Sequence, residues 1–149
     1  MTPHHIRQSN LIEGVDNQQE DIRGLVIWNR IIKWDWSPEL PTFTHGEIMA
    51  RLWPNIAGNY RHVNVQVGDF LAPRWQDVES MMQEWCADMD DWKNLDPKDM
   101  HIRFEKIHPF RDGNGRAGRM LMWWHESKLG LEPTLIEQVN VNEYYKWFE

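Results

Sequence analysis

Apolar residues recur along most of the chain at the three- and four-residue spacing of amphipathic helices. The first such stretch runs from residue 16 to residue 33, and its apolar positions are Ile22, Leu25, Val26 and Ile32. Similar spacing, together with flanking prolines and glycines, predicts five further helices. We expect these helices at residues 44–52, 73–92, 97–107, 114–130 and 142–148.

Local sequence signals indicate where some of these helices begin. Thr44 followed by Glu47 has the form of a capping box, in which the two side chains satisfy free N–H groups of the first turn. Asp96-Pro97 combines a capping side chain with a residue suited to the first helical position. Two prolines within residues 38–41 are expected to interrupt the chain just before Thr44.

The pattern changes to strict alternation of apolar and polar residues after His62. The alternating positions are Val63, Asn64, Val65, Gln66 and Val67. This alternation predicts a strand, and Gly68 supplies a turn after which Phe70-Leu71 can return as a second strand. The fold class expected from the whole pattern is mostly α, a helical bundle with one short β-hairpin at about residues 62–72.

The composition fits one globular domain. The chain has 149 residues, of which 41% are hydrophobic, which is enough for a single buried core. Its formal net charge is −7, so we expect no non-specific binding to nucleic acid or to an anionic membrane surface. The single cysteine, Cys86, excludes an internal disulfide, and its helical surroundings predict a buried thiol.

Tryptophan is frequent, and the N-terminal residues are polar. The ten tryptophans are spread along the whole chain, which favours packing in a helical core over a single aromatic cage. The polar start and the lack of a long apolar stretch predict a cytoplasmic protein without a leader peptide. We interpret His4-His5 as part of an N-terminal tail, residues 1–8, because no further ligands at metal-binding spacing accompany the pair.

Residues 108–119 read HPFRDGNGRAGR and contain the side chains best suited to chemistry. A glycine-rich turn that opens a helix directs main-chain N–H groups toward an anion, and the helix dipole favours negative charge there. Arg116 and Arg119 are three residues apart and can reach one side of the helix start. Asp112 offers the hard oxygen that Mg²⁺ prefers, and His108 has an ordinary pKa near neutrality. The segment therefore indicates a phosphate-binding turn.

The same twelve residues resemble the signature HPFx(D/E)GNGRxxR of the Fic (filamentation induced by cAMP) family, and every specified position is matched. The resemblance covers residues 9–148 and implies the Fic fold in a single domain, residues 9–149. It implies transfer of AMP from ATP to a Ser, Thr or Tyr hydroxyl of a target protein, with His108 as the general base and Asp112 holding Mg²⁺. The resemblance also implies an anion hole formed by Gly113, Asn114 and Gly115. It implies contacts from Arg116 and Arg119 to the β- and γ-phosphates, and a core anchor at Phe110.

Residues 9–14 resemble a second Fic-family motif, (S/T)xxxE(G/N), which marks an inhibitory helix. Ser9, Glu13 and Gly14 match its specified positions. The resemblance implies that Glu13 pairs with Arg119 and denies it to the γ-phosphate, because a carboxylate can compete with a phosphate for the same guanidinium. Taken alone, the pattern also fits an N-cap serine followed by a surface acid.

The resemblance also gives the predicted hairpin a role. In the Fic fold a hairpin flap before the motif clamps the target by adding it as an extra strand, and residues 63–68 occupy that place. Main-chain pairing of this kind demands little of the target sequence. Tyr144 and Tyr145 either line the pocket for the nucleotide base or pack in the core, and the sequence leaves both readings open.

The implied function is a self-inhibited protein adenylyltransferase, with self-modification as one outcome. Removal of AMP from a modified target, with Glu13 orienting a water, is an alternative, as is transfer of UMP, phosphate or phosphocholine. The death-on-curing branch, a kinase, has Lys at the position of Gly115, which argues against that branch. A non-catalytic nucleotide-binding adaptor and a toxin-like module are further alternatives. The target, the base preference and the choice between monomer and homodimer stay open.

Overall fold

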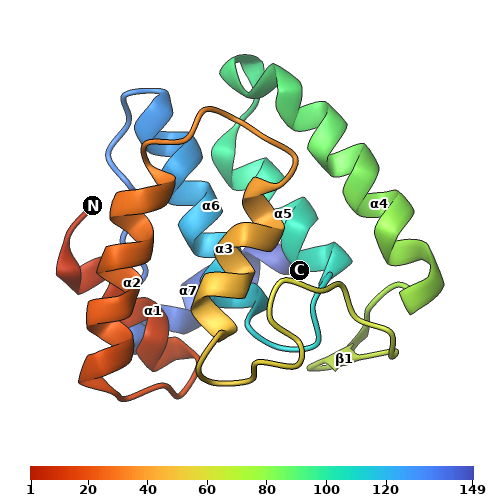
Figure 1. Ribbon diagram of the computed structural model, residues 1–149, viewed down its shortest axis with the longest axis horizontal. Coiled ribbons are helices and arrows are strands. Elements are labelled where there is room, and N and C mark those ends of the chain that lie inside the picture. The colour runs from red at the N-terminus through yellow and green to blue at the C-terminus, as the bar shows by residue number, and fades with distance from the viewer.

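Helix α6 (Asn114–Lys128) lies at the centre of the structure, a computed structural model that describes residues 1–149. Its middle is apolar on every side, and twelve of its residues are buried, as expected for a helix surrounded by protein. Helices α5 (Pro97–Ile107) and α3 (Leu40–Met49) pack along it. Figure 1 shows the two N-terminal helices on one side of this centre and the long helix that precedes α5 on the other. The predicted class, mostly α with one hairpin, is confirmed.

Residues 3–8, predicted to be a tail, belong to helix α1 (Pro3–Ile12). The prediction was wrong because this segment is held by contacts distant in sequence. His5 Nε2 lies 3.0 Å from the carbonyl oxygen of Pro133. The buried Ile6 packs on Gly24 of helix α2 (Gln18–Ile31), where a Cβ atom would lie 2.5 Å from Ile6 Cγ2. Helix α1 is thereby docked on the domain and not free in solvent.

Helix α3 begins four residues earlier than Thr44. It starts at Leu40 and has Pro41 in its first turn, where the missing N–H would have no partner in any case. Thr44 lies inside the helix, and its buried hydroxyl has no hydrogen-bond partner. The predicted capping box is therefore wrong, and the proline is part of the helix start instead of a break before it.

The hairpin is shorter than the alternation of valines suggested. Strands β1 (Gln66–Val67) and β2 (Phe70–Leu71) pair antiparallel, with Gln66 opposite Leu71. Val63 and Asn64 lie outside the strands, so a strand starting there was a wrong prediction. Asn64 instead binds the residue that begins the next helix, because its Oδ1 accepts from the Trp75 N–H at 2.9 Å.

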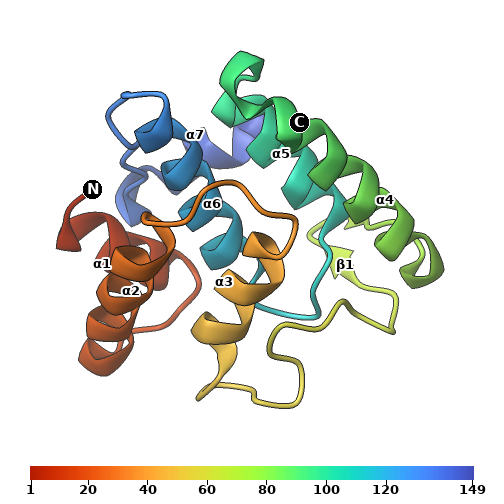
Figure 2. The same ribbon diagram turned by 45° about the horizontal axis from the view of Figure 1, so that its top comes forward.

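The remaining helices follow the predicted order. Helix α4 (Trp75–Asp88) continues as a 3-10 helix, Met89–Asn94, so the predicted helix 73–92 changes character near its end. Asp96 caps α5 as expected, because its Oδ1 accepts from the Asp99 N–H at 3.0 Å. The C-terminal part contains helix α7 (Val141–Tyr145) between the 3-10 helices Gln138–Asn140 and Lys146–Phe148. Figure 2 shows α7 behind α6.

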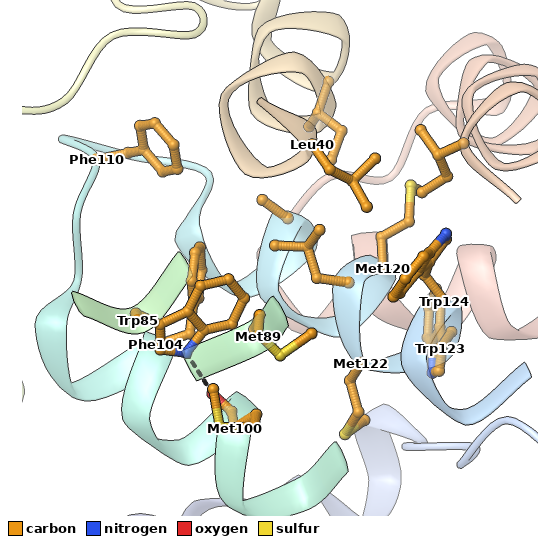
Figure 3. Close-up of a cluster of buried hydrophobic side chains, with 14 of the residues drawn as sticks. Leu40, Trp85, Met89, Met100, Phe104, Phe110, Met120, Met122, Trp123 and Trp124 are labelled. Carbon is orange, nitrogen blue, oxygen red and sulfur yellow. Dashed lines mark hydrogen bonds between the residues drawn. The ribbon is translucent and has the colours of Figure 1, made fainter. Parts of the chain in front are cut away.

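Aromatic, methionine and aliphatic side chains fill the core between α3, α4, α5 and α6 (Figure 3). No tryptophan is exposed, which confirms that the tryptophans pack in the domain. Buried indole N–H groups find main-chain partners, and Trp85 Nε1 donates to the Met100 carbonyl at 3.0 Å. Cys86 is buried as predicted. None of the helices is both long and apolar enough to span a membrane.

Candidate functional site

The motif segment connects the end of α5 to the start of α6. His108 ends α5 in the left-handed conformation, with φ 51°. The Asn114 side chain closes the following loop, because its Oδ1 accepts from the Phe110 N–H and its Nδ2 donates to the Phe110 carbonyl, both at 2.8 Å. Phe110 itself is fully buried, as expected for a core anchor. The loop thus holds His108 and the first turn of α6 in a fixed relation.

His45 of α3 holds the same loop from the other side, a role that was not predicted from the sequence. Its ring stacks on Phe110 with centroids 3.6 Å apart. Its Nε2 donates to the Asp112 carbonyl at 2.7 Å, and its Nδ1 accepts from the Gly58 N–H at 3.0 Å. Burial lowers the pKa of His45 to about 4. His45 is therefore neutral and supports the loop structurally.

His108 has the state that a general base requires. Its Nδ1 lies 3.3 Å from the main-chain oxygen of Glu105. Since a carbonyl can only accept, Nδ1 carries the proton and Nε2 retains its lone pair. Burial lowers the pKa of His108, as does the charge of Arg61, while the Glu105 main chain, Glu13 and Asp112 oppose this. Neutral imidazole is the form present at pH 7.

The two motif arginines have different surroundings. Arg119 is 1% exposed, and its Nε donates to Ser9 Oγ at 2.8 Å while its Nη2 donates to the Ser9 carbonyl at 3.1 Å and to Glu13 Oε1 at 2.8 Å. Arg116 is also buried, but no carboxylate pairs with it and its Nε has no partner. Its Nη2 lies 3.4 Å from Met49 Sδ. Burial lowers the pKa of Arg116, so an incoming anion would stabilise its charge.

Glu13 is the final, capping residue of α1 and places its carboxylate on the first turn of α6. A Cβ atom on Gly115 would collide with Glu13 Oε1, so the carboxylate lies directly against the main chain of the predicted anion hole. Ser9 and Glu13 share one face of α1 and both bind Arg119. Gly14 follows with φ 72° and lets the chain turn away. The Glu13 side chain is still 33% exposed.

A buried polar network beneath Arg119 was not predicted. Tyr144 is buried, its hydroxyl lies 2.8 Å from His101 Nε2, and it accepts from Arg119 Nη1 at 3.4 Å. Glu105 has a buried Oε1 without a partner, and burial raises its pKa to about 8 although Arg119 acts in the opposite direction. Of the two readings for the tyrosines, core packing describes Tyr144, whereas Tyr145 is exposed.

Asp112 has a carboxylate suited to a metal bound chiefly by substrate. It is exposed, and its Oδ1 accepts from the Gly113 N–H at 2.8 Å. No group of three acidic, histidine or cysteine side chains forms a metal cage in the structure. Mg²⁺ is commonly held by one or two carboxylates together with phosphate oxygens and water. One free carboxylate beside the helix start fits that arrangement.

Comparisons with known proteins agree with this geometry. A sequence model of the Fic/DOC family matches residues 38–125. The chain is 33% identical over 110 residues to a protein named protein adenylyltransferase Fic from Nematostella vectensis, covering 69% of this chain and 26% of that protein. Over 113 residues it is 32% identical to protein adenylyltransferase fic-1 of Caenorhabditis briggsae, covering 68% and 21%. It thus spans about a quarter of the length of these relatives.

Two solved structures share the fold. A Fic domain containing signaling protein from Bacteroides thetaiotaomicron superimposes with a TM-score of 0.80, covering 97% of this chain and 69% of that one, at 18% identity. Fic-1 of C. elegans, residues 134–508, superimposes with a TM-score of 0.77, covering 95% and 52%, also at 18% identity. Both likenesses extend beyond residues 38–125, the part of the chain that the family model matches.

Proposed function

This chain belongs to the Fic/DOC family, and from that premise we propose that it is a protein adenylyltransferase whose own Glu13 holds the activity off. The reaction would transfer AMP from ATP to a Ser, Thr or Tyr hydroxyl of a target protein. The names of the curated relatives, protein adenylyltransferase, support this assignment. The observation that carries it is the carboxylate of Glu13, which lies at the start of α6 and hydrogen-bonds to Arg119.

The position of Glu13 supports both parts of the proposal. A helix start with converging N–H groups binds anions, and here an anion from the chain itself lies against it. While Glu13 and Ser9 engage Nε and Nη2 of Arg119, that guanidinium cannot form a paired contact with a terminal phosphate. Arg116 has no such competitor, so part of the phosphate site stays available. ATP would then bind without the contact that aligns it for transfer.

The chemical step follows from the state of His108. Its unprotonated Nε2 would accept the proton of the target hydroxyl as that oxygen bonds to the α-phosphorus. The bond from this phosphorus to the β-phosphate oxygen breaks, and pyrophosphate leaves. Asp112 would hold Mg²⁺, which neutralises phosphate charge when bound. The main-chain N–H groups of the α6 start would stabilise the negative charge that develops on the α-phosphate.

The hairpin is the proposed docking place for the target. Val67, Phe70 and Leu71 are exposed, and each strand pairs on one edge only. An extended target segment can therefore add by main-chain hydrogen bonds without a defined sequence. A cytoplasmic location and a homodimer stay predictions.

The test is transfer of label from ATP to the protein itself, with wild type, Glu13→Gly and His108→Ala compared. Label at the α-phosphate should be incorporated, label at the γ-phosphate should not, and Glu13→Gly should increase incorporation. His108→Ala should abolish it while ATP binding persists. Glu132→Gly, a change of an exposed glutamate, is the matched control and should behave as wild type. Incorporation from γ-labelled ATP would show phosphate transfer instead.

Removal of AMP uses the same site and is separated by the same variants. The Glu13 carboxylate is partly exposed and could orient a water toward a modified side chain. Wild type would then release AMP from protein that Glu13→Gly has labelled, and Glu13→Gly would not. Absence of release by wild type would leave inhibition as the only role of Glu13.

A further inference from the structure

Arg61 binds the main chain on both sides of His108. It precedes the hairpin and is 3% exposed. Its Nε donates to the His108 carbonyl at 2.7 Å and its Nη2 to the Ile107 carbonyl at 3.3 Å. Its own N–H donates to the Pro109 carbonyl at 2.9 Å. Three consecutive carbonyls of the motif segment are thus bound by one residue.

These bonds address a specific weakness of the chain at that point. The last carbonyls of a helix lack partners inside the helix, and a cation there interacts favourably with the helix dipole. His108 also adopts a left-handed conformation, which is unfavourable for a residue with a side chain. The guanidinium of Arg61 binds the last carbonyl of α5, that of Ile107, and the carbonyl of the capping His108, and so holds the turn that directs the imidazole.

The same guanidinium also binds both ends of the hairpin excursion. Nη1 donates to the Val63 carbonyl at 2.9 Å, and Nη2 donates to the Pro73 carbonyl at 2.6 Å. The chain therefore enters and leaves the flap at one side chain. No acidic residue pairs with Arg61, so its hydrogen bonds go to the flap base and the His108 turn alone.

We propose that Arg61 is a positioning residue that fixes the base of the flap relative to His108, and so sets the distance from a docked target hydroxyl to the imidazole. The proposal rests on the proposed function in one respect, the identity of the docked group. The hydrogen bonds through which Arg61 connects the base of the flap to the His108 turn are observed in this structure and do not depend on that function. In-line transfer is sensitive to placement, and an error of about 1 Å can cost about 10²-fold in rate.

Arg61 also acts on His108 through its charge. The groups that bear on the imidazole are Arg61, Glu13, Asp112 and the main chain of Glu105. Burial has the largest effect on the pKa of His108, and Arg61 lowers it in the same direction. Removing the positive charge should therefore raise the pKa of His108, which a purely structural residue would not do.

Two variants separate charge from geometry, each made in wild type and in Glu13→Gly. Arg61→Gln removes the charge and most of the donors, and Arg61→Lys keeps the charge but cannot reach all four main-chain carbonyls that the guanidinium binds. Arg74→Gln is the matched control, because Arg74 lies beside the hairpin and is exposed. The measurements are the His108 titration by NMR, hydrogen exchange at the Ala72 amide, which pairs with the Val65 carbonyl, and self-labelling from α-labelled ATP.

In Arg61→Gln we expect a raised pKa of His108, faster exchange at Ala72 and self-labelling reduced about 10²-fold. In Arg61→Lys the pKa should stay near that of wild type while exchange is faster. An unchanged His108 titration in Arg61→Gln, with unchanged exchange in a folded protein, would overturn the proposal. If the Glu13→Gly parent incorporates no label, AMP transfer is wrong, and the titration and exchange still decide the role of Arg61.

Discussion

The replacement of Glu13 by Gln tests whether a charge, and not the bulk of α1, closes the site. The two side chains have nearly the same size, so the change removes a negative charge and keeps the shape. Glu13 Oε1 accepts from Arg119 Nη2 at 2.8 Å, and the Arg119 side chain is 1% exposed against 33% for Glu13. Hydrogen bonds to charged groups contribute about 1.5–3 kcal/mol. Since about 1.4 kcal/mol is tenfold, productive ATP binding should strengthen by about 10- to 150-fold.

The assay is the initial rate of self-labelling from α-labelled ATP at subsaturating concentration, together with ATP affinity by calorimetry. Glu143→Gln is the matched control. Its carboxylate lies 2.7 Å from Lys146 Nζ, but both side chains are largely exposed, at 74% and 58%. Exposed pairs of this kind contribute about 0–1 kcal/mol, so this change should leave the rate near that of wild type.

We expect the increase in productive ATP binding to lie near the lower end of the range given above, because the Glu13 side chain is partly exposed to water. A rate in Glu13→Gln within about twofold of wild type, with Glu13→Gly strongly activated, would refute the argument from charge. The side chain would then act by occupying space over Gly115. If neither variant is activated, Glu13 does not inhibit at all, and its contact with Arg119 has only a structural role.

Three further predictions concern the supports of the site. Ile6→Ala removes a buried contact of α1 with Gly24, which costs about 2–5 kcal/mol; it should undock α1 and raise self-labelling, and unchanged labelling would show that α1 is held elsewhere. His45→Phe keeps the ring beside Phe110 but leaves two main-chain groups unpaired, each at about 1–3 kcal/mol, so urea unfolding should show a less stable protein with weaker ATP binding. Glu105 has a folded pKa of about 8 against an ordinary 4.5, so the folded state binds the proton more tightly and the free energy of unfolding should fall as pH rises from 4.5 to 8. In Glu105→Gln, the difference in the free energy of unfolding between pH 5 and pH 8.5, measured by urea titration, should be smaller than in wild type. An equal difference in the two proteins would contradict the assignment.

The motif and the fold class were predictable because their signals are local. The order His108, Asp112, Gly113 and Arg119 determines a turn followed by a helix, and the spacing of apolar residues determines most of the bundle. The four-residue spacing of Ser9 and Glu13 correctly put both on one face of a helix. The predictions that failed also used local evidence, but that evidence had a second interpretation. At Thr44, for example, a capping pattern lies inside a helix that starts at Leu40 and has a proline in its first turn.

The supports of the site could not be predicted, since they depend on contacts between distant residues. His45 binds the main chain of Asp112 67 positions away, and Arg61 binds that of His108 47 positions away. A buried histidine or arginine has no local signature that separates it from an exposed one. The beginning of the first helix, residues 3–8, was missed for the same reason, because polar residues such as His5 and Gln8 find their partners near residues 133–138.

Glu13 and Arg119 are separated by 106 positions along the chain, and this separation affects how a newly synthesised chain folds. Synthesis proceeds from the N-terminus, so α1 exists before the ribosome has added the arginine that it will hold. Under the proposed inhibition by Glu13, each new chain can therefore fold directly into the inhibited state, without passing through an active one. Because the two groups share one chain, their effective concentration is set by the fold, and the proposed inhibition would not depend on the concentration of the protein.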